Sequence, residues 1–161
     1  YYFDLRYRPF SISDDDGKTW SKPAPLKWDD GEHVVSLRSW SKLIRANSGK
    51  LYWIANILPD LDNLNENIIA QLKRTGRADP RYPLVMAEVD EAALTLKRDT
   101  ETVIIDREPN ETEYVRFSNF FCYIDRISGE IVLYLMKCYH ENQPDIENMP
   151  HPAWRYRIKV L

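Results

Sequence analysis

The stretch Ser13-Asp14-Asp15-Asp16-Gly17-Lys18-Thr19-Trp20 predicts a tight turn between two strands. The carboxylate of Asp15 can accept hydrogen bonds from backbone N–H groups of the turn, and Gly17 can adopt a positive φ angle. Thr19 favours the strand that follows, and we expect Trp20 to pack between sheets. These roles stabilise a turn, so we interpret the stretch as structural rather than catalytic or calcium-binding. Its structural residues are Ser13, Asp15, Gly17, Thr19 and Trp20.

Two features of the sequence recur further along the chain. Ser48-Gly49-Lys50-Leu51 is echoed by Ser128-Gly129-Glu130-Ile131. The 13–20 stretch has a degenerate counterpart in residues 89–96, at nearly the same spacing. Two independent features with nearly the same period indicate a repeated structural unit. We predict a unit of four antiparallel strands, repeated around an axis as in a β-propeller.

Alternating apolar residues and short turn motifs predict strands along most of the chain. Aromatic residues make up 12% of the sequence and also favour strands. Residues 60–75 differ, because their leucines and isoleucines recur at helical spacing and predict one short inserted helix. The predicted strands are residues 1–12, 20–28, 39–46, 50–57, 83–89, 102–106, 117–124, 130–138 and 154–161.

Composition excludes several classes of protein. The 161 residues suffice for a buried core in one ordinary domain, and 43% hydrophobic with 29% charged residues is typical of a globular chain. A net charge of −3 without a basic stripe argues against nucleic-acid binding. No apolar run approaches the ~20 residues that span a bilayer, so no membrane span is predicted. The three histidines show no metal-ligand spacing, and we predict neither a metal nor a cofactor.

The two cysteines, Cys122 and Cys138, fall in consecutive predicted strands. Mirroring these strands about the Ser128-Gly129 turn places Cys122 opposite Leu135 rather than opposite Cys138. We therefore predict two buried thiols and no disulfide.

The 13–20 stretch matches the Asp-box pattern S-x-D-x-G-x-T-W at every position. Residues 80–85, Pro-Arg-Tyr-Pro-Leu-Val, resemble the Arg-x-x-Leu strand that leads into a later Asp-box. The sequence thus resembles the sialidase (neuraminidase) superfamily of β-propellers, whose Asp-boxes are also called BNR repeats. The resemblance implies an all-β, six-bladed propeller, of which this chain supplies about two and a half four-stranded blades from the C-terminal part. It also favours a secreted or periplasmic location.

On this resemblance, residues 1–161 form a single partial propeller domain. Residues 1–33 end one blade and carry the Asp-box, residues 34–110 form a second blade with the helical insert, and residues 111–161 form most of a third. The chain opens on Tyr1 in strand-like sequence, which fits a fragment of a longer propeller.

The same topology implies where a site would lie. In an antiparallel meander, the start of strand one, the end of strand two and the start of strand three share one end of the sheet. In sialidases this end holds the active site. Arg81 matches a family arginine that grips a carboxylate, a role that suits its planar fork, although an exposed surface arginine is the alternative. The predicted substrate-binding residues are Arg81, Arg38, Tyr82, Trp40 and Arg116, with Trp154 as a further ring that could stack on a sugar. For the aromatic residues Trp40, Tyr82 and Trp154, a place in the core is the alternative.

The resemblance leaves three functions open. The family's catalytic tyrosine falls at Phe117, which has no hydroxyl, so no catalytic residue is assigned. The first hypothesis is a glycoside hydrolase acting on glycans with an acidic sugar, by a substrate or mechanism different from that of sialidases. The second is a non-catalytic propeller that binds carbohydrate or protein. The third is an assembly role, because an incomplete propeller exposes sheet edges that can pair with the missing blades or with another chain.

Overall fold

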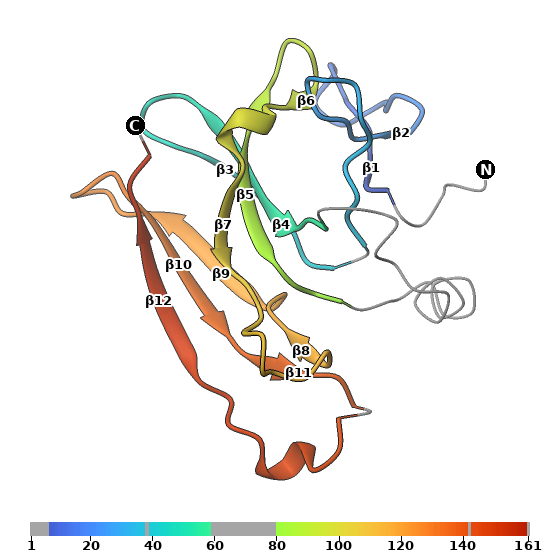
Figure 1. Ribbon diagram of the computed structural model, residues 1–161. Helices are drawn as coiled ribbons and strands as arrows, with labels where there is room; N and C mark the ends of the chain where they lie inside the picture. The colour runs from blue at the N-terminus through green and yellow to red at the C-terminus, as the bar shows by residue number, and fades with distance from the viewer. Residues whose placement is uncertain (1–6, 38, 59–79, 142, 161) are drawn as a thin grey trace.

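The computed structural model describes residues 7–37, 39–58, 80–141 and 143–160, and within them the protein is all-β. Figure 1 shows antiparallel sheets that follow one another along the chain. The helical elements of the described residues are two short 3-10 turns, η1 (Arg98–Thr100) and η2 (Ile146–Asn148). The predicted all-β class is therefore confirmed. The helix expected over 60–75, the beginning of the strand expected over 1–12, and Arg38 lie outside the described residues.

The central sheet has five antiparallel strands, the last two of which, β6 and β7, share one edge of β5. Its first three strands pair in the order β3-β4-β5, and β6 and β7 both pair with the far edge of β5. The turn between β3 and β4 has Gly49 at a φ of 88°, a conformation that glycine adopts without strain. The strands are β3 (Lys42–Arg45), β4 (Leu51–Asn56), β5 (Leu84–Asp90), β6 (Thr95–Leu96) and β7 (Thr102–Ile105).

The second sheet has three strands in the order β9-β10-β12. They are β9 (Phe120–Ile124), β10 (Ile131–Met136) and β12 (Ala153–Ile158). When the repeated Ser-Gly motifs at Ser48-Gly49 and Ser128-Gly129 are superimposed in sequence, β4 aligns with β10 over its whole length. The repeat therefore corresponds to equivalent strands in two similar sheets. A short pair, β8 (Val115–Arg116) and β11 (Cys138–Tyr139), precedes β9 and follows β10.

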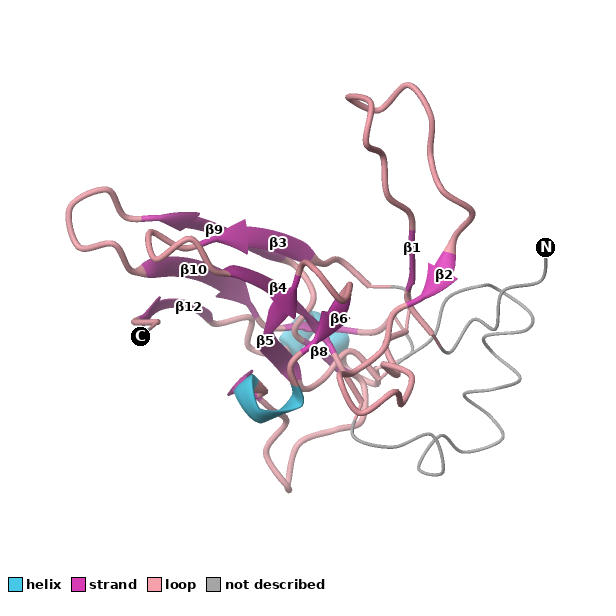
Figure 2. Ribbon diagram, turned by 90° about the horizontal axis from the view of Figure 1, so that it is seen from above, coloured by secondary structure: helices cyan, strands magenta, loops and turns pink. Residues whose placement is uncertain are grey.

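The N-terminal part is less regular than its sequence predicts. It forms the pair β1 (Pro9–Phe10) and β2 (Ala24–Pro25), and the chain between these strands projects away from the sheets (Figure 2). The strand predicted over 20–28 is thus reduced to β2 and isolated bridges at Lys27 and Trp28. Trp20 does not pack between sheets. The residue is 64% exposed. Its indole N–H donates to the Gly17 carbonyl of the same turn at 3.1 Å, so the ring lies against this turn and not against a sheet.

The core has two clusters, one on each face of the central sheet. Along β4, Tyr52 and Ile54 face the second sheet, while Trp53 and Ala55 face the N-terminal part. This alternation follows the two-residue period of a strand. Because both faces are covered, the inner strands β4 and β5 are buried between the second sheet and the N-terminal part.

The two cysteines are free thiols, as predicted, but only Cys122 is buried, and Cys138 is partly exposed. The predicted register, however, was wrong by two residues, because Cys122 lies opposite Leu133 rather than Leu135. The cause is the turn: the Asp125 N–H bonds to the Glu130 carbonyl at 2.9 Å, which closes the hairpin around four residues instead of two.

Candidate functional site

Arg81 and Arg116 lie side by side at the end of the sheets where β3, β9 and β12 begin, which we call the strand-start end. The two residues form a parallel β-bridge, and the Phe117 N–H donates to the Arg81 carbonyl at 2.9 Å. Arg81 also reaches across with its side chain, because Nη1 donates to the Ser118 Oγ at 3.3 Å. The structure therefore brings together two of the predicted arginines, from the segments that lead into β5 and β9.

Asn56 holds these two segments together through hydrogen bonds, and the sequence did not predict this role. It ends β4, is 1% exposed, and donates through Nδ2 to the carbonyls of Arg81 at 2.9 Å and of Pro83 and Phe117 at 3.2 Å each. The Ser36 hydroxyl donates to the Asn56 carbonyl at 2.8 Å. A buried amide that satisfies several backbone carbonyls fixes the loops that carry the site. The signal in the sequence is a single asparagine closing an otherwise apolar strand.

Arg8 fixes the segment that carries Trp40, and it too was missed. Its Nη2 donates to the carbonyls of Leu37 at 2.9 Å and Ser39 at 3.0 Å, and its guanidinium lies 5.8 Å from the Trp53 ring centroid. These contacts join residues about thirty positions apart in the chain. No local sequence pattern predicts these contacts of Arg8, because they depend on how the N-terminal part packs against the central sheet.

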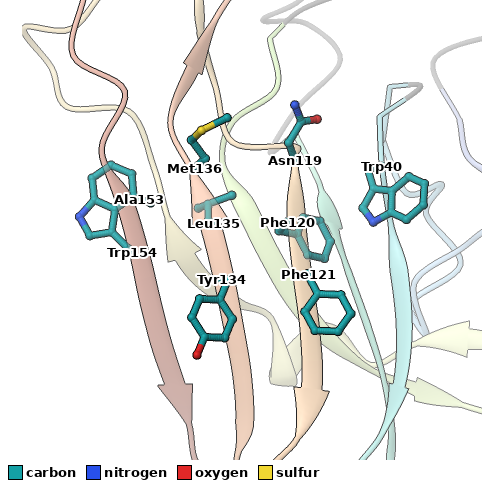
Figure 3. Close-up of a pocket in the computed structure, with 9 residues that line it drawn as sticks. All are labelled: Trp40, Asn119, Phe120, Phe121, Tyr134, Leu135, Met136, Ala153 and Trp154. Atoms are coloured by element: carbon teal, nitrogen blue, oxygen red, sulfur yellow. The ribbon is translucent and has the colours of Figure 1, made fainter.

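An open groove lies at the same end, between Trp40 and the second sheet (Figure 3). Its volume is about 460 Å³, and none of its described lining residues is charged. Trp40 and Trp154 stand on opposite sides, and Trp40 is 61% exposed. The lining residues are Trp40, Asn119, Phe120, Phe121, Tyr134, Leu135, Met136, Ala153 and Trp154.

The groove and the arginines are linked by residues that are adjacent in the sequence. Ser118, which accepts the bond from Arg81, directly precedes Asn119, whose side chain lines the groove. The strand-start end therefore carries an uncharged aromatic groove and, close to it along the chain, two arginines that are not among its described lining residues. That combination can hold an anionic group through charge-assisted hydrogen bonds and a flat ring through stacking.

Tyr82 does not line the groove. Its ring packs against the core shared by the two sheets, and the Arg107 guanidinium lies 5.1 Å from the ring centroid. Burial raises the pKa of the Tyr82 phenol above its ordinary value, while the charge of Arg107 opposes that rise. Among the predicted ligand-binding residues, Tyr82 thus has the geometry of a core side chain.

Phe117 is part of the core as well. It is 1% exposed, and its ring centroid lies 6.3 Å from that of Trp154 in an edge-on arrangement. At position 117 the chain therefore buries an aromatic ring that supports one wall of the groove.

The carboxylates in the ion pairs of the described residues gather mainly at the opposite, hairpin end of the sheets. Glu91 forms a two-pronged pair with Arg45, with both oxygen–nitrogen distances 2.7 Å. Buried Glu88 pairs with Lys97 and Lys50, and the hydrogen bond from Lys97 is the main reason why its pKa is lowered. Across the ranges that the structure describes, no group of three or more His, Cys, Asp or Glu is arranged to hold a metal ion.

Comparisons with protein-family models, curated proteins and solved structures gave no match. The described part of the chain contains no helix that is long and apolar enough to cross a membrane. The fold and the site define the protein as an all-β chain of several antiparallel sheets with an aromatic groove at their strand-start end.

Proposed function

We propose that the chain is part of a sialidase-like, six-bladed β-propeller that acts on glycans at the strand-start end of its sheets. The observation that carries the proposal is the groove, where Trp40, the first two residues of β9 and of β12, and the last three residues of β10 meet. Support for the propeller comes from the two similar sheets in which β4 and β10 are equivalent, and from the central sheet buried on both faces.

The groove suits a sugar ring. Its volume of about 460 Å³ falls in the range of small-molecule sites. Aromatic rings such as Trp40 and Trp154 present flat apolar surfaces to the C–H face of a pyranose, while the Asn119 amide and the Tyr134 hydroxyl can bond to sugar hydroxyls. A lining without charge fits a neutral sugar.

The neighbouring arginines suit an acidic sugar. Arginine pairs with a carboxylate through two parallel hydrogen bonds, which fixes the orientation of the ligand as well as binding it. The substrate class that we propose is therefore a glycan in which an acidic sugar, held by Arg81 and Arg116, is joined to a neutral sugar in the groove.

The reaction that we propose is hydrolysis of the glycosidic bond without a tyrosine nucleophile. A second candidate function, binding of carbohydrate without cleavage, is favoured by Phe117, which lacks the hydroxyl that retaining sialidases use and is buried in the core. The two candidates share one binding site and differ only in whether an acid/base pair of carboxylates acts on the bound glycan.

Incubation with oligosaccharides that carry an acidic sugar, followed by mass spectrometry, separates these candidates. The samples are the wild-type chain and Arg81→Gln, with Arg126→Gln as a matched control because Arg126 is exposed in the β9-β10 turn. Cleavage that Arg81→Gln reduces and Arg126→Gln does not reduce supports hydrolysis. Binding without cleavage supports the second candidate, and neither binding nor cleavage overturns the proposal.

A further inference from the structure

A chain of hydrogen bonds connects two segments that line the groove. The Ser36 hydroxyl accepts a hydrogen bond from Arg8 Nη2 at 3.5 Å and donates one to the Asn56 carbonyl at 2.8 Å, since a hydroxyl can act as acceptor and donor at once. The Asn56 side chain continues the chain of bonds, because its Nδ2 donates to the carbonyls of Arg81 and Phe117. Arg8, Ser36 and Asn56 thus form one connected set of side chains, which we call the Asn56 network.

The two ends of the Asn56 network lie next to lining residues of the groove (Figure 3). At one end, Arg8 donates to the Ser39 carbonyl at 3.0 Å, and Ser39 directly precedes Trp40. At the other end, Phe117 is followed by Ser118 and then by Asn119, which lines the groove on the side of the second sheet. Trp40 and Asn119 are far apart in the sequence, so their spacing in the folded chain depends on what joins their segments.

Burial makes the bonds of the Asn56 network selective for side-chain type. Ser36 and Asn56 are each 1% exposed, so bulk water does not compete for their hydrogen bonds. The Asn56 amide nitrogen meets three backbone carbonyls, those of Arg81, Pro83 and Phe117. An ionised aspartate of the same size has no hydrogen to donate and would place negative charge against these carbonyl oxygens. An amide at position 56 therefore holds together segments that a carboxylate would push apart.

We propose that Asn56 and Ser36 are positioning residues, which set the spacing between Trp40 and the segment that carries Arg81 and Asn119. This role rests on the proposed function, in which the groove is the glycan site. A ligand that contacts both segments binds more tightly when their spacing is fixed in advance, because less conformational freedom is lost on binding. Both residues are buried, so they act through the backbone of the two segments and not by touching the glycan.

Two variants and a destabilised control test this role on the full chain. By NMR titration with sialyllactose, we expect Asn56→Asp to weaken binding about tenfold, and Ser36→Ala, which removes one bond in the middle of the network, about threefold. Ser36→Ala keeps every amide donor, so it carries the test if Asn56→Asp does not fold. Leu96→Ala, a buried position at the hairpin end of the same sheet, lowers stability but touches none of these bonds, and is expected to change the affinity less than about twofold.

Equal weakening of binding by Leu96→Ala and Ser36→Ala would show that affinity follows stability alone, and it would overturn the proposal. So would a Ser36→Ala variant that binds sialyllactose as tightly as the wild-type chain.

The NMR spectrum of the ligand-free chain tests the network separately from the proposed function. We expect Ser36→Ala to move both the Trp40 indole N–H signal and the Phe117 amide signal, whereas Leu96→Ala moves neither. Because Phe117 is remote from Ser36 in the sequence, movement of both signals is the signature of coupled segments. Movement of the Trp40 signal alone would overturn the proposal. A wild-type chain with coupled segments that binds no sialyllactose would support the positioning role and overturn the proposed function.

Discussion

The carboxylate of Asp15 accepts two hydrogen bonds from Thr19, one from the backbone N–H at 2.8 Å and one from the hydroxyl at 2.7 Å. The bond from the backbone is the main reason why the pKa of Asp15 falls from 3.8 to about 2, and the Thr19 and Ser13 hydroxyls lower it further. In this turn the aspartate is therefore a structural acceptor, as its place in the sequence predicts.

The first prediction concerns the pH dependence of stability. Because the folded pKa of Asp15 lies below its unfolded value, its contribution is complete above about pH 4 and is lost as the pH falls toward 2. Urea unfolding from pH 6 to pH 2 is expected to show a gap between wild type and Asp15→Asn that narrows below about pH 4. At neutral pH, the exposed neighbour variant Asp14→Asn is expected to destabilise less. A gap of the same size at pH 2.5 and pH 6 would contradict this account.

The second prediction concerns the core that joins the two sheets. Ile54 is 0% exposed on the face of β4 that packs against the second sheet. Ile54→Ala is expected to lower the free energy of unfolding by about 2–5 kcal/mol, since it removes buried surface and leaves a cavity. Val103→Ala, on β7 of the same sheet and 55% exposed, is expected to cost less than about 1 kcal/mol.

Hydrogen exchange of β10 checks whether that core is shared. If the sheets unfold together, Ile54→Ala speeds exchange in β10 as well as in β4. Faster exchange confined to the central sheet would show that the second sheet is stable on its own, contrary to the packing described above.

The third prediction concerns the thiols. Burial raises the pKa of Cys122 and of Cys138, so both have little thiolate at neutral pH. Iodoacetamide alkylation, followed by mass spectrometry, is expected to be slow at both sites in the folded chain, slowest at buried Cys122, and fast at both in urea. Alkylation of Cys122 at the rate of an unfolded thiol would place it outside the core.

The features that the sequence predicted correctly depend on neighbours in the chain. The β3-β4 hairpin follows from Gly49 and the flanking alternation, and the equivalence of β4 and β10 follows from the echo between the Ser48-Gly49 and Ser128-Gly129 turns. The strand predicted over 154–161 corresponds to β12, Ala153–Ile158.

The features that were wrong or missed depend on contacts between distant segments. Asn56 and Arg8 bond to backbone carbonyls of other elements, which no local pattern marks. Trp20 lies in a loop that projects from the sheets, so its apolar ring closes on its own turn. Tyr82 was proposed as a ring that could stack on a sugar, with core packing as the alternative, and its ring packs against the core shared by the two sheets.

The central claim, a glycan bound at the strand-start end, is tested most directly by NMR of the indole N–H signals of the 5 tryptophans. Sialyllactose, which joins an acidic sugar to neutral ones, is the probe. Trp40 and Trp154 line the groove, whereas Trp28 and Trp53 are buried elsewhere and Trp20 is exposed in the 13–20 turn. We predict saturable shifts of the Trp40 and Trp154 signals, with Trp20, Trp28 and Trp53 unchanged, and an affinity that Trp40→Ala lowers about tenfold. Absence of shifts at saturating ligand, or shifts as large at Trp20 as at Trp40, would contradict the claim.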